Sequence, residues 1–123
     1  MNKICTSLEQ SKKLMELGID IKTADICWSI DIPDLPTLLA YPITDCDNWE
    51  NKIPAWSLSA LLELIPDKIS ISNESYYLSF TKKSVEFRGP ITWDGQKAKS
   101  FEMDNTLDAA FEMIVWLKEN GKI

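Results

Sequence analysis

Between positions 68 and 103 the chain alternates between apolar and polar side chains, and this period of two constrains the fold more than any other feature. The alternating apolar positions are Ile69 and Ile71, then Tyr76, Leu78 and Phe80, then Val85 and Phe87. Because successive side chains of a strand point to opposite faces, the pattern predicts strands with one buried and one solvated face. Asp94-Gly95 is typical of a tight hairpin turn. We therefore predict an antiparallel meander of three to four strands.

The last strand of this meander, near Lys99 to Met103, breaks the alternation. Ala98 and Phe101 are separated by an odd number of positions, so a regular strand would place them on opposite faces. One extra residue in a β-bulge restores the pattern, and we expect a bulge here. The solvated face of the sheet is expected to carry Tyr77, Ser79, Thr81, Glu86 and Arg88.

The C-terminal segment has the clearest helical pattern. Asn105 or Thr106 is suited to cap its start, and the helix should run to about Glu119, with Gly121 closing it. Its apolar stripe consists of Leu107, Ala110, Phe111, Ile114 and Val115. Further apolar residues, Met113, Trp116 and Leu117, widen the stripe beyond what a surface helix needs. The helix is therefore predicted to contact two neighbours or to lie partly in a subunit interface.

Two helices are predicted before the meander. Thr6 and Glu9 have the spacing of a capping box, in which two side chains satisfy free backbone donors, and predict a helix over 7–17. Ser57 is suited to cap a second helix that ends at Pro66 and buries one face. That face consists of Leu58, Leu61, Leu62 and Ile65. A shorter helical turn is predicted over 22–28, where Thr23 is suited as a cap.

The segment from Asp31 to Pro54 contains four prolines, which lack the backbone donor that helices and sheets require. We predict an irregular segment that packs across the domain, because its apolar residues are too numerous for a free linker. Helices before and after a meander indicate the α+β class, with N-terminal, central and C-terminal helices packed on one face of the sheet. The length of 123 residues is typical of one domain with one core. We expect residues 1–123 to form a single α+β domain.

Cysteine usage indicates a reducing compartment. Cys5, Cys27 and Cys46 are an odd number at wide spacings, which is not a disulfide framework. Cys5 and Cys27 are expected to pack in the core as small apolar side chains. No apolar run approaches the roughly 20 residues that cross a bilayer. We expect a cytoplasmic protein that neither enters a membrane nor is secreted.

Charge disfavours nucleic acid as a partner. The formal net charge is −6, from 19 acidic against 13 basic residues, and Arg88 is the sole arginine. Backbone phosphates are bound by basic patches, and base edges are read chiefly by arginine. The lysine-rich segment over 82–99 is interpreted as solubilising charge on the sheet. The acidic balance instead suits an inhibitor that binds a basic or DNA-binding protein.

The chain contains no histidine, which removes the commonest general base and the commonest metal ligand. Asp45-Cys46-Asp47-Asn48 has some calcium-loop character but lacks the turn glycine, so it is interpreted as a solvated loop. Asp104, Asp108 and Glu112 share a helical face, where acidic side chains favour the helix dipole. We predict no catalytic residue, no cofactor and no metal site. A small enzyme that uses carboxylates without histidine is the third class of function considered.

Five tryptophans are the most unusual element of the composition. Tryptophan is enriched at protein interfaces, although core packing is the first interpretation for each of these residues. Trp56 follows Pro54 closely and suits the core. Trp49 and Trp93 lie in polar loop contexts and are candidate partner contacts. Trp116, on the wide apolar stripe, is the third candidate.

Three segments carry a family resemblance. Residues 4–10 read ICTSLEQ, residues 54–58 read PAWSL, and residues 105–117 read NTLDAAFEMIVWL. In these segments the chain resembles small uncharacterised bacterial proteins associated with prophage or mobile elements. The resemblance implies a phage-associated accessory role and brings no activity or site residues. The leading hypothesis is a non-enzymatic protein-interaction module with an unknown protein partner or a second copy, using the C-terminal helix or the proline-rich segment.

Overall fold

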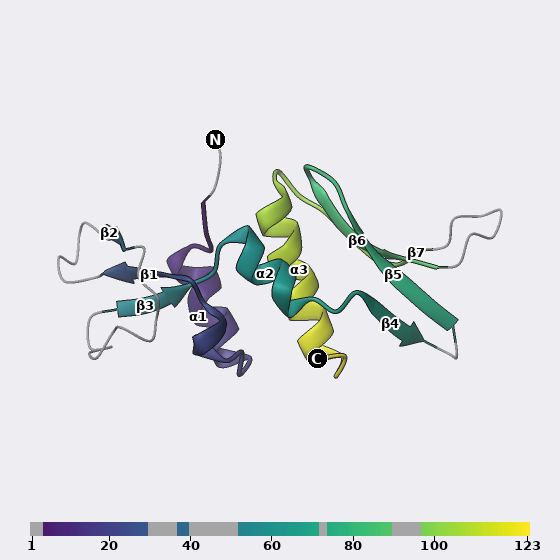
Figure 1. Cartoon of the computed structure of the whole chain (residues 1–123), viewed down its shortest axis with the longest axis horizontal. Helices are drawn as coiled ribbons and strands as arrows, with labels where there is room; N and C mark the ends of the chain where they lie inside the picture. The colour runs from purple at the N-terminus through teal and green to yellow at the C-terminus, as the bar shows by residue number, and fades with distance from the viewer. Residues whose placement is uncertain (1–3, 30–36, 40–51, 72–73, 90–96) are drawn as a thin grey trace.

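Two antiparallel sheets lie at opposite ends of the molecule with helices between them (Figure 1). The computed structural model describes residues 4–29, 37–39, 52–71, 74–89 and 97–123. The helices are α1 (Leu8–Glu16), α2 (Leu58–Leu64) and α3 (Thr106–Glu119), with a 3-10 turn, η1, at Ile21–Thr23. The strands are β1 (Ile26–Ser29), β2 (Thr37–Leu39), β3 (Lys52–Ala55), β4 (Lys68–Ile71), β5 (Glu74–Phe80), β6 (Ser84–Arg88) and β7 (Lys97–Glu102). This arrangement confirms the α+β class.

The larger sheet is the predicted meander, with strand order β4-β5-β6-β7. Apolar residues pair across neighbouring strands on one face: Ile69 with Tyr76, Leu78 with Phe87, and Val85 with Phe101. The register of β6 and β7 shifts between Phe87 and Arg88, which lie opposite Lys99 and Lys97. Ala98 is therefore the extra residue, and the predicted bulge is confirmed.

Helix α3 packs against β6 and β7 on one side and against α2 on the other (Figure 1). Its buried residues include Leu107, Met113, Ile114 and Leu117. The prediction that the wide apolar stripe contacts two neighbours is confirmed. Asn105 is the N-cap, since its side-chain oxygen accepts a hydrogen bond from the Asp108 backbone N–H at 2.8 Å.

The face of the meander that points away from α3 is less exposed to solvent than the sequence predicts. Tyr77 is 54% exposed and Arg88 is also exposed, in agreement with the pattern, but Glu86 is only 4% exposed. The prediction that Glu86 lies in solvent is therefore wrong. Its carboxylate accepts hydrogen bonds from the Arg88 guanidinium and, at 3.4 Å, from the Ser100 hydroxyl. Such partners offset the cost of burying a charge.

The smaller sheet, in the order β2-β1-β3, was not predicted. The helical turn expected over 22–28 ends at Thr23, and Trp28 lies in β1 opposite Ile53. The segment expected to be irregular contributes β2 and β3. Pro54 lies inside β3, where its missing donor is tolerated because β3 is an edge strand among the described strands.

Helix α1 begins one residue later than predicted. Ser7 is the N-cap, and Gln10 completes the capping box, because each side chain bonds the backbone N–H of the other residue. Thr6, the predicted cap, is buried, and its hydroxyl accepts a hydrogen bond from the Trp56 backbone N–H at 3.1 Å. Helix α1 packs against β3, whereas α3 is the helix that covers the meander.

Other local predictions are confirmed. Ser57 caps α2 by accepting a hydrogen bond from the Ala60 backbone N–H. Trp56 is fully buried, and its indole N–H donates to the Thr23 hydroxyl at 2.9 Å. Cys5 and Cys27 are both buried. Within the described ranges, no helix is long and apolar enough to cross a membrane.

Candidate functional site

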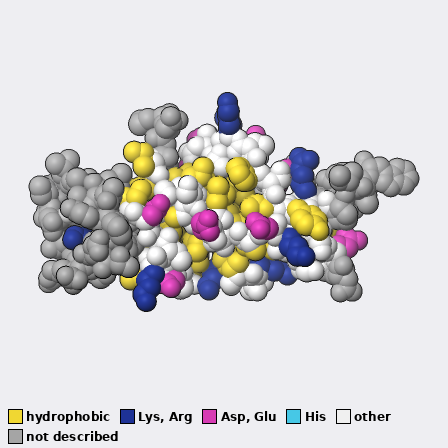
Figure 2. All heavy atoms as spheres, viewed as in Figure 1, with side chains coloured by type: hydrophobic (Ala, Val, Ile, Leu, Met, Phe, Trp, Pro, Cys, Tyr) yellow, Lys and Arg dark blue, Asp and Glu magenta, His cyan; other side chains and the backbone are white. Residues whose placement is uncertain are grey.

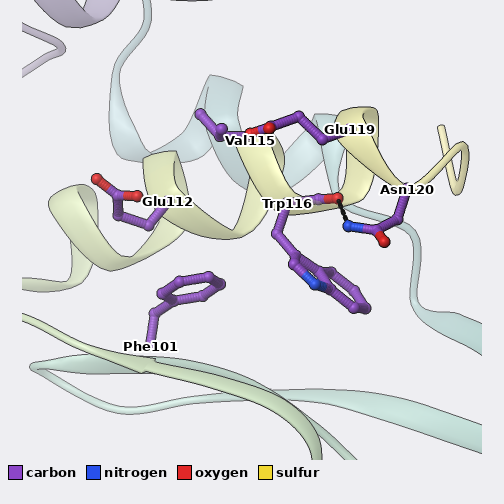
Figure 3. A pocket seen from close by; sticks show the side chains of 6 residues that line it. All are labelled: Phe101, Glu112, Val115, Trp116, Glu119 and Asn120. Atoms are coloured by element: carbon purple, nitrogen blue, oxygen red, sulfur yellow. Dashed lines mark hydrogen bonds between the residues drawn. The ribbon is translucent and has the colours of Figure 1, made fainter.

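A pocket of about 240 Å³ lies between the C-terminal half of α3 and strand β7 (Figure 3). It is lined by Phe101, Glu112, Val115, Trp116, Glu119 and Asn120. The Phe101 ring rises from β7 toward the helix, and the Trp116 indole extends from α3 toward the sheet. The two aromatic side chains therefore border the same space from opposite walls.

Helical geometry explains why two carboxylates accompany Trp116. Glu112 precedes Trp116 by four residues and Glu119 follows it by three, so all three lie along one side of α3. At about 1.5 Å of rise per residue, the two glutamates are about 10 Å apart along the helix axis. Trp116 thus lies between two negative charges.

The end of the helix is held by Asn120. Its side-chain amide donates a hydrogen bond to the Trp116 carbonyl at 2.8 Å, and its backbone N–H donates to the same oxygen at 3.0 Å. The backbone bond continues the i to i+4 pattern of the helix, and the side-chain amide adds a second donor to the same oxygen. The backbone that carries the indole is therefore fixed at the pocket.

The aromatic wall on β7 already has a cationic neighbour. Lys99 Nζ lies 4.9 Å from the centroid of the Phe101 ring, within the range of a cation–π interaction. Lys99 and Phe101 are two residues apart on one strand and therefore point to the same face. Lys99 itself is not one of the residues that line the pocket.

The size of the pocket limits what it receives. Sites for drug-sized ligands measure about 300–1,000 Å³, and this pocket falls below that range. A single side-chain head group is a better match than a metabolite or a nucleotide. Among the described residues, no group of three or more Cys, Asp or Glu is placed to hold a metal ion.

A second hollow, of about 500 Å³, lies at the start of α1 and is lined by Ser7, Leu8, Glu9 and Trp28. The Trp28 side chain, which forms part of its wall, is held in place because its indole N–H donates a hydrogen bond to the Thr6 carbonyl at 3.0 Å. Ser7 is already engaged as the helix cap. Among the described residues that line this hollow, Glu9 is the only charged one, so the described lining offers less chemistry than that of the α3 pocket.

The three tryptophans predicted as partner contacts have different outcomes. Trp116 is partly buried and lines the α3 pocket. Trp49 and Trp93 lie outside the described residues, as does the acidic run 45–48 with Cys46. The prediction that these side chains contact a partner stays a prediction.

The carboxylates that share a helical face in the sequence have separate environments in the structure. Asp108 accepts hydrogen bonds from the side chains of Gln10 and Asn105, at 2.9 and 3.0 Å. Asp104 is exposed before the helix begins, and Glu112 lines the pocket. They do not form one acid/base pair.

Sequence reasoning missed the association of Trp116 with Phe101, Glu112 and Glu119. The Glu112–Trp116–Glu119 spacing was a readable signal, because such spacing places side chains on one side of a helix. Phe101 carried no comparable signal, since its position depends on the bulge in β7 and on how α3 packs on the sheet.

Hydrophobic side chains gather over the middle of the molecule on the face drawn in Figure 2, and acidic side chains stand among them. No family model, no curated protein and no solved structure matches this chain. Function is therefore argued from the chemistry of the pocket itself.

Proposed function

We propose that this protein is a non-enzymatic protein-interaction module whose contact surface is the pocket between α3 and β7. The observation that carries the proposal is the position of Trp116. Neighbouring apolar residues of α3, Met113, Ile114 and Leu117, are fully buried, whereas Trp116 and Val115 remain partly exposed. Partly exposed tryptophan in a pocket is typical of residues that dominate binding energy at protein interfaces.

Two further observations support a protein-binding role over an enzymatic one. The pocket is smaller than typical small-molecule sites. The chain has no histidine to act as a general base. The phage-associated role and the cytoplasmic location stay predictions.

The experiment compares three tagged proteins as baits in an extract of the native host. Wild type is compared with Trp116→Ala and with Tyr77→Ala, which removes an exposed aromatic side chain from the opposite face of the meander. We expect partners that wild type and Tyr77→Ala retain and Trp116→Ala loses. Circular dichroism checks that each variant is folded. Equal retention by all three baits would contradict the proposal.

A second copy of the chain is the alternative occupant of the pocket. Size-exclusion chromatography with light scattering at high micromolar concentration tests this alternative. A dimer for wild type and a monomer for Trp116→Ala would assign the pocket to self-association. Monomers for both would exclude self-association through this pocket.

An acidic inhibitor of a basic partner is the second candidate function. The observation in its favour is that Glu112 and Glu119 flank the aromatic wall of a chain whose net charge is −6. Exposed charges are screened within about 10 Å at 0.1 M salt. A partner bound chiefly by charge should therefore be lost from the bait in high salt, whereas a partner bound by Trp116 packing should be retained.

A further inference from the structure

We infer that the α3 pocket receives the guanidinium group of an arginine side chain from the partner, an inference that rests on the proposed function. The pocket combines two aromatic side chains, Phe101 and Trp116, with two carboxylates, Glu112 and Glu119. Each pair restricts the chemistry of the occupant. Together they select a planar cation.

The aromatic pair favours a cation with a flat, weakly hydrated surface. Cations are attracted to the faces of aromatic rings, most strongly to tryptophan. Lys99 Nζ, 4.9 Å from the Phe101 centroid, is an example of this attraction at the same ring within the chain. Guanidinium stacks on aromatic faces and is more weakly hydrated than ammonium, so it loses less on entering the pocket.

The carboxylates exclude the other classes of side chain. An acidic side chain would meet repulsion from both Glu112 and Glu119. An apolar side chain would remove water from the carboxylates without replacing their hydrogen bonds, which is unfavourable. A guanidinium has five N–H donors in a fixed plane, so it can face the aromatic walls and donate at its edges.

The dimensions agree with one head group. Along the helix axis Trp116 is about 6 Å from Glu112 and about 4.5 Å from Glu119, and both glutamates line the pocket with it. A pocket of about 240 Å³ accommodates one side-chain end but not a longer peptide segment. The partner is therefore expected to insert a single arginine.

The test uses the intact chain labelled with ¹⁵N and observes the indole N–H signals of its five tryptophans by NMR. The Trp116→Phe variant assigns the Trp116 signal. The probe is N-acetyl-arginine methylamide, and N-acetyl-citrulline methylamide is the control with the same shape and no charge. N-acetyl-lysine methylamide compares the two basic side chains.

We expect a saturable shift of the Trp116 indole signal with the arginine probe, a weaker response to lysine and none to citrulline. The double variant Glu112→Gln with Glu119→Gln should weaken arginine binding by roughly 2- to 30-fold, the range for two exposed ion pairs. A matched control, Glu16→Gln with Glu63→Gln, changes the net charge equally at exposed positions outside the pocket and should bind as wild type does.

The inference would be overturned by the absence of a saturable shift with arginine, by an equal response to citrulline, or by stronger binding of lysine. Equal weakening by both glutamine double variants would also overturn it, because the effect would then follow net charge rather than the pocket. If the probes fail while Trp116→Ala still loses its partner in the bait experiment, the inference falls and the proposed function stands. If the probes bind while Trp116→Ala retains every partner, the proposed function falls.

Discussion

Gln10 on α1 donates a hydrogen bond from Nε2 to Oδ1 of Asp108 on α3, a distance of 2.9 Å across 98 positions of the chain. The same glutamine side chain also accepts a hydrogen bond from the Ser7 backbone N–H, which completes the α1 capping box. Asp108 in turn is bonded to Asn105, the cap of α3. The starts of the two helices are therefore joined through the residues that cap them.

The first prediction concerns this link. Gln10→Ala removes a cap partner and a side-chain hydrogen bond, and should lower the free energy of unfolding by about 1–2 kcal/mol. Gln10→Glu keeps the capping box but faces Asp108 with a like charge, so it should also be less stable than wild type. Urea unfolding measures both variants. Wild-type stability for Gln10→Glu would show that the contact with Asp108 contributes little.

A second prediction concerns the buried hydroxyl of Thr6. It accepts a hydrogen bond from the Trp56 backbone N–H at 3.1 Å and lies 2.8 Å from the Ser11 hydroxyl. Thr6→Val keeps the shape but deprives two buried groups of this partner, each at a cost of about 1–3 kcal/mol. We expect a loss of roughly 2–6 kcal/mol in denaturant unfolding.

Two variants serve as controls for Thr6. Thr6→Ser retains the hydroxyl and should lose less stability than Thr6→Val. Adding Ser11→Ala to Thr6→Val removes one of the deprived groups, so the double variant should be no less stable than Thr6→Val alone. Equal losses for Thr6→Ser and Thr6→Val would mean that the hydroxyl is not the source of the effect.

The third prediction is a pH dependence. Partial burial of the phenol, the hydrogen bond to Glu74 and the negative charge of Glu74 raise the pKa of Tyr76 above its usual value of 10.0. The unfolded chain therefore releases this proton at a lower pH than the folded chain does. The contribution to stability is complete below pH 10 and is lost as the pH rises above it.

The difference in phenolate absorbance between wild type and Tyr76→Phe isolates this titration. We expect the pKa of Tyr76 to lie above 10.0 and to fall in Glu74→Gln, which removes the nearby charge. Wild type should also lose more stability above that pH than Tyr76→Phe does. A pKa for Tyr76 at or below the usual value would refute the prediction.

Local patterns in the sequence were sufficient to predict the meander and helix α3. Alternation correctly predicted that Leu78, Val85 and Phe87 pack in or against the core, but it also assigned Phe80 to this buried face, where its side chain is 53% exposed. The odd spacing of Ala98 and Phe101 predicted the bulge in β7. These features depend on neighbouring residues, which the sequence displays directly. The same holds for the helix caps, since Ser57 was predicted to cap α2 and Asn105 was one of two residues predicted to cap α3.

The sheet formed by β1, β2 and β3 depends on distant pairing, which the sequence does not display. Trp28 pairs with Ile53 across 25 positions, and the prolines in between argued against any strand. Thr6 and Ser7 are both suited to cap α1, and the competing requirement of Trp56 for a buried acceptor selects Ser7. The pocket likewise needs the packing of α3 on β7 before Phe101 can meet Trp116.

The burial of Glu86 could not be predicted from the alternation of the sequence, and it leads to the last prediction. Alternation assigns it correctly to the face away from Phe87, but it does not reveal that the carboxylate is buried with Arg88 as a partner. Arg88→Met leaves the buried carboxylate without the guanidinium. Because Arg88 itself is largely exposed, the expected loss is about 1–3 kcal/mol, less than for a fully buried ion pair.

A double-mutant cycle separates the ion pair from other effects at these positions. Glu86→Gln with Arg88→Met removes both charges and should be more stable than Arg88→Met alone, since no uncompensated carboxylate remains buried. Denaturant unfolding of the four proteins gives the coupling free energy. Additive losses would mean that Arg88 does not compensate the buried charge, and that Ser100 and the surrounding strands hold Glu86 in place without it.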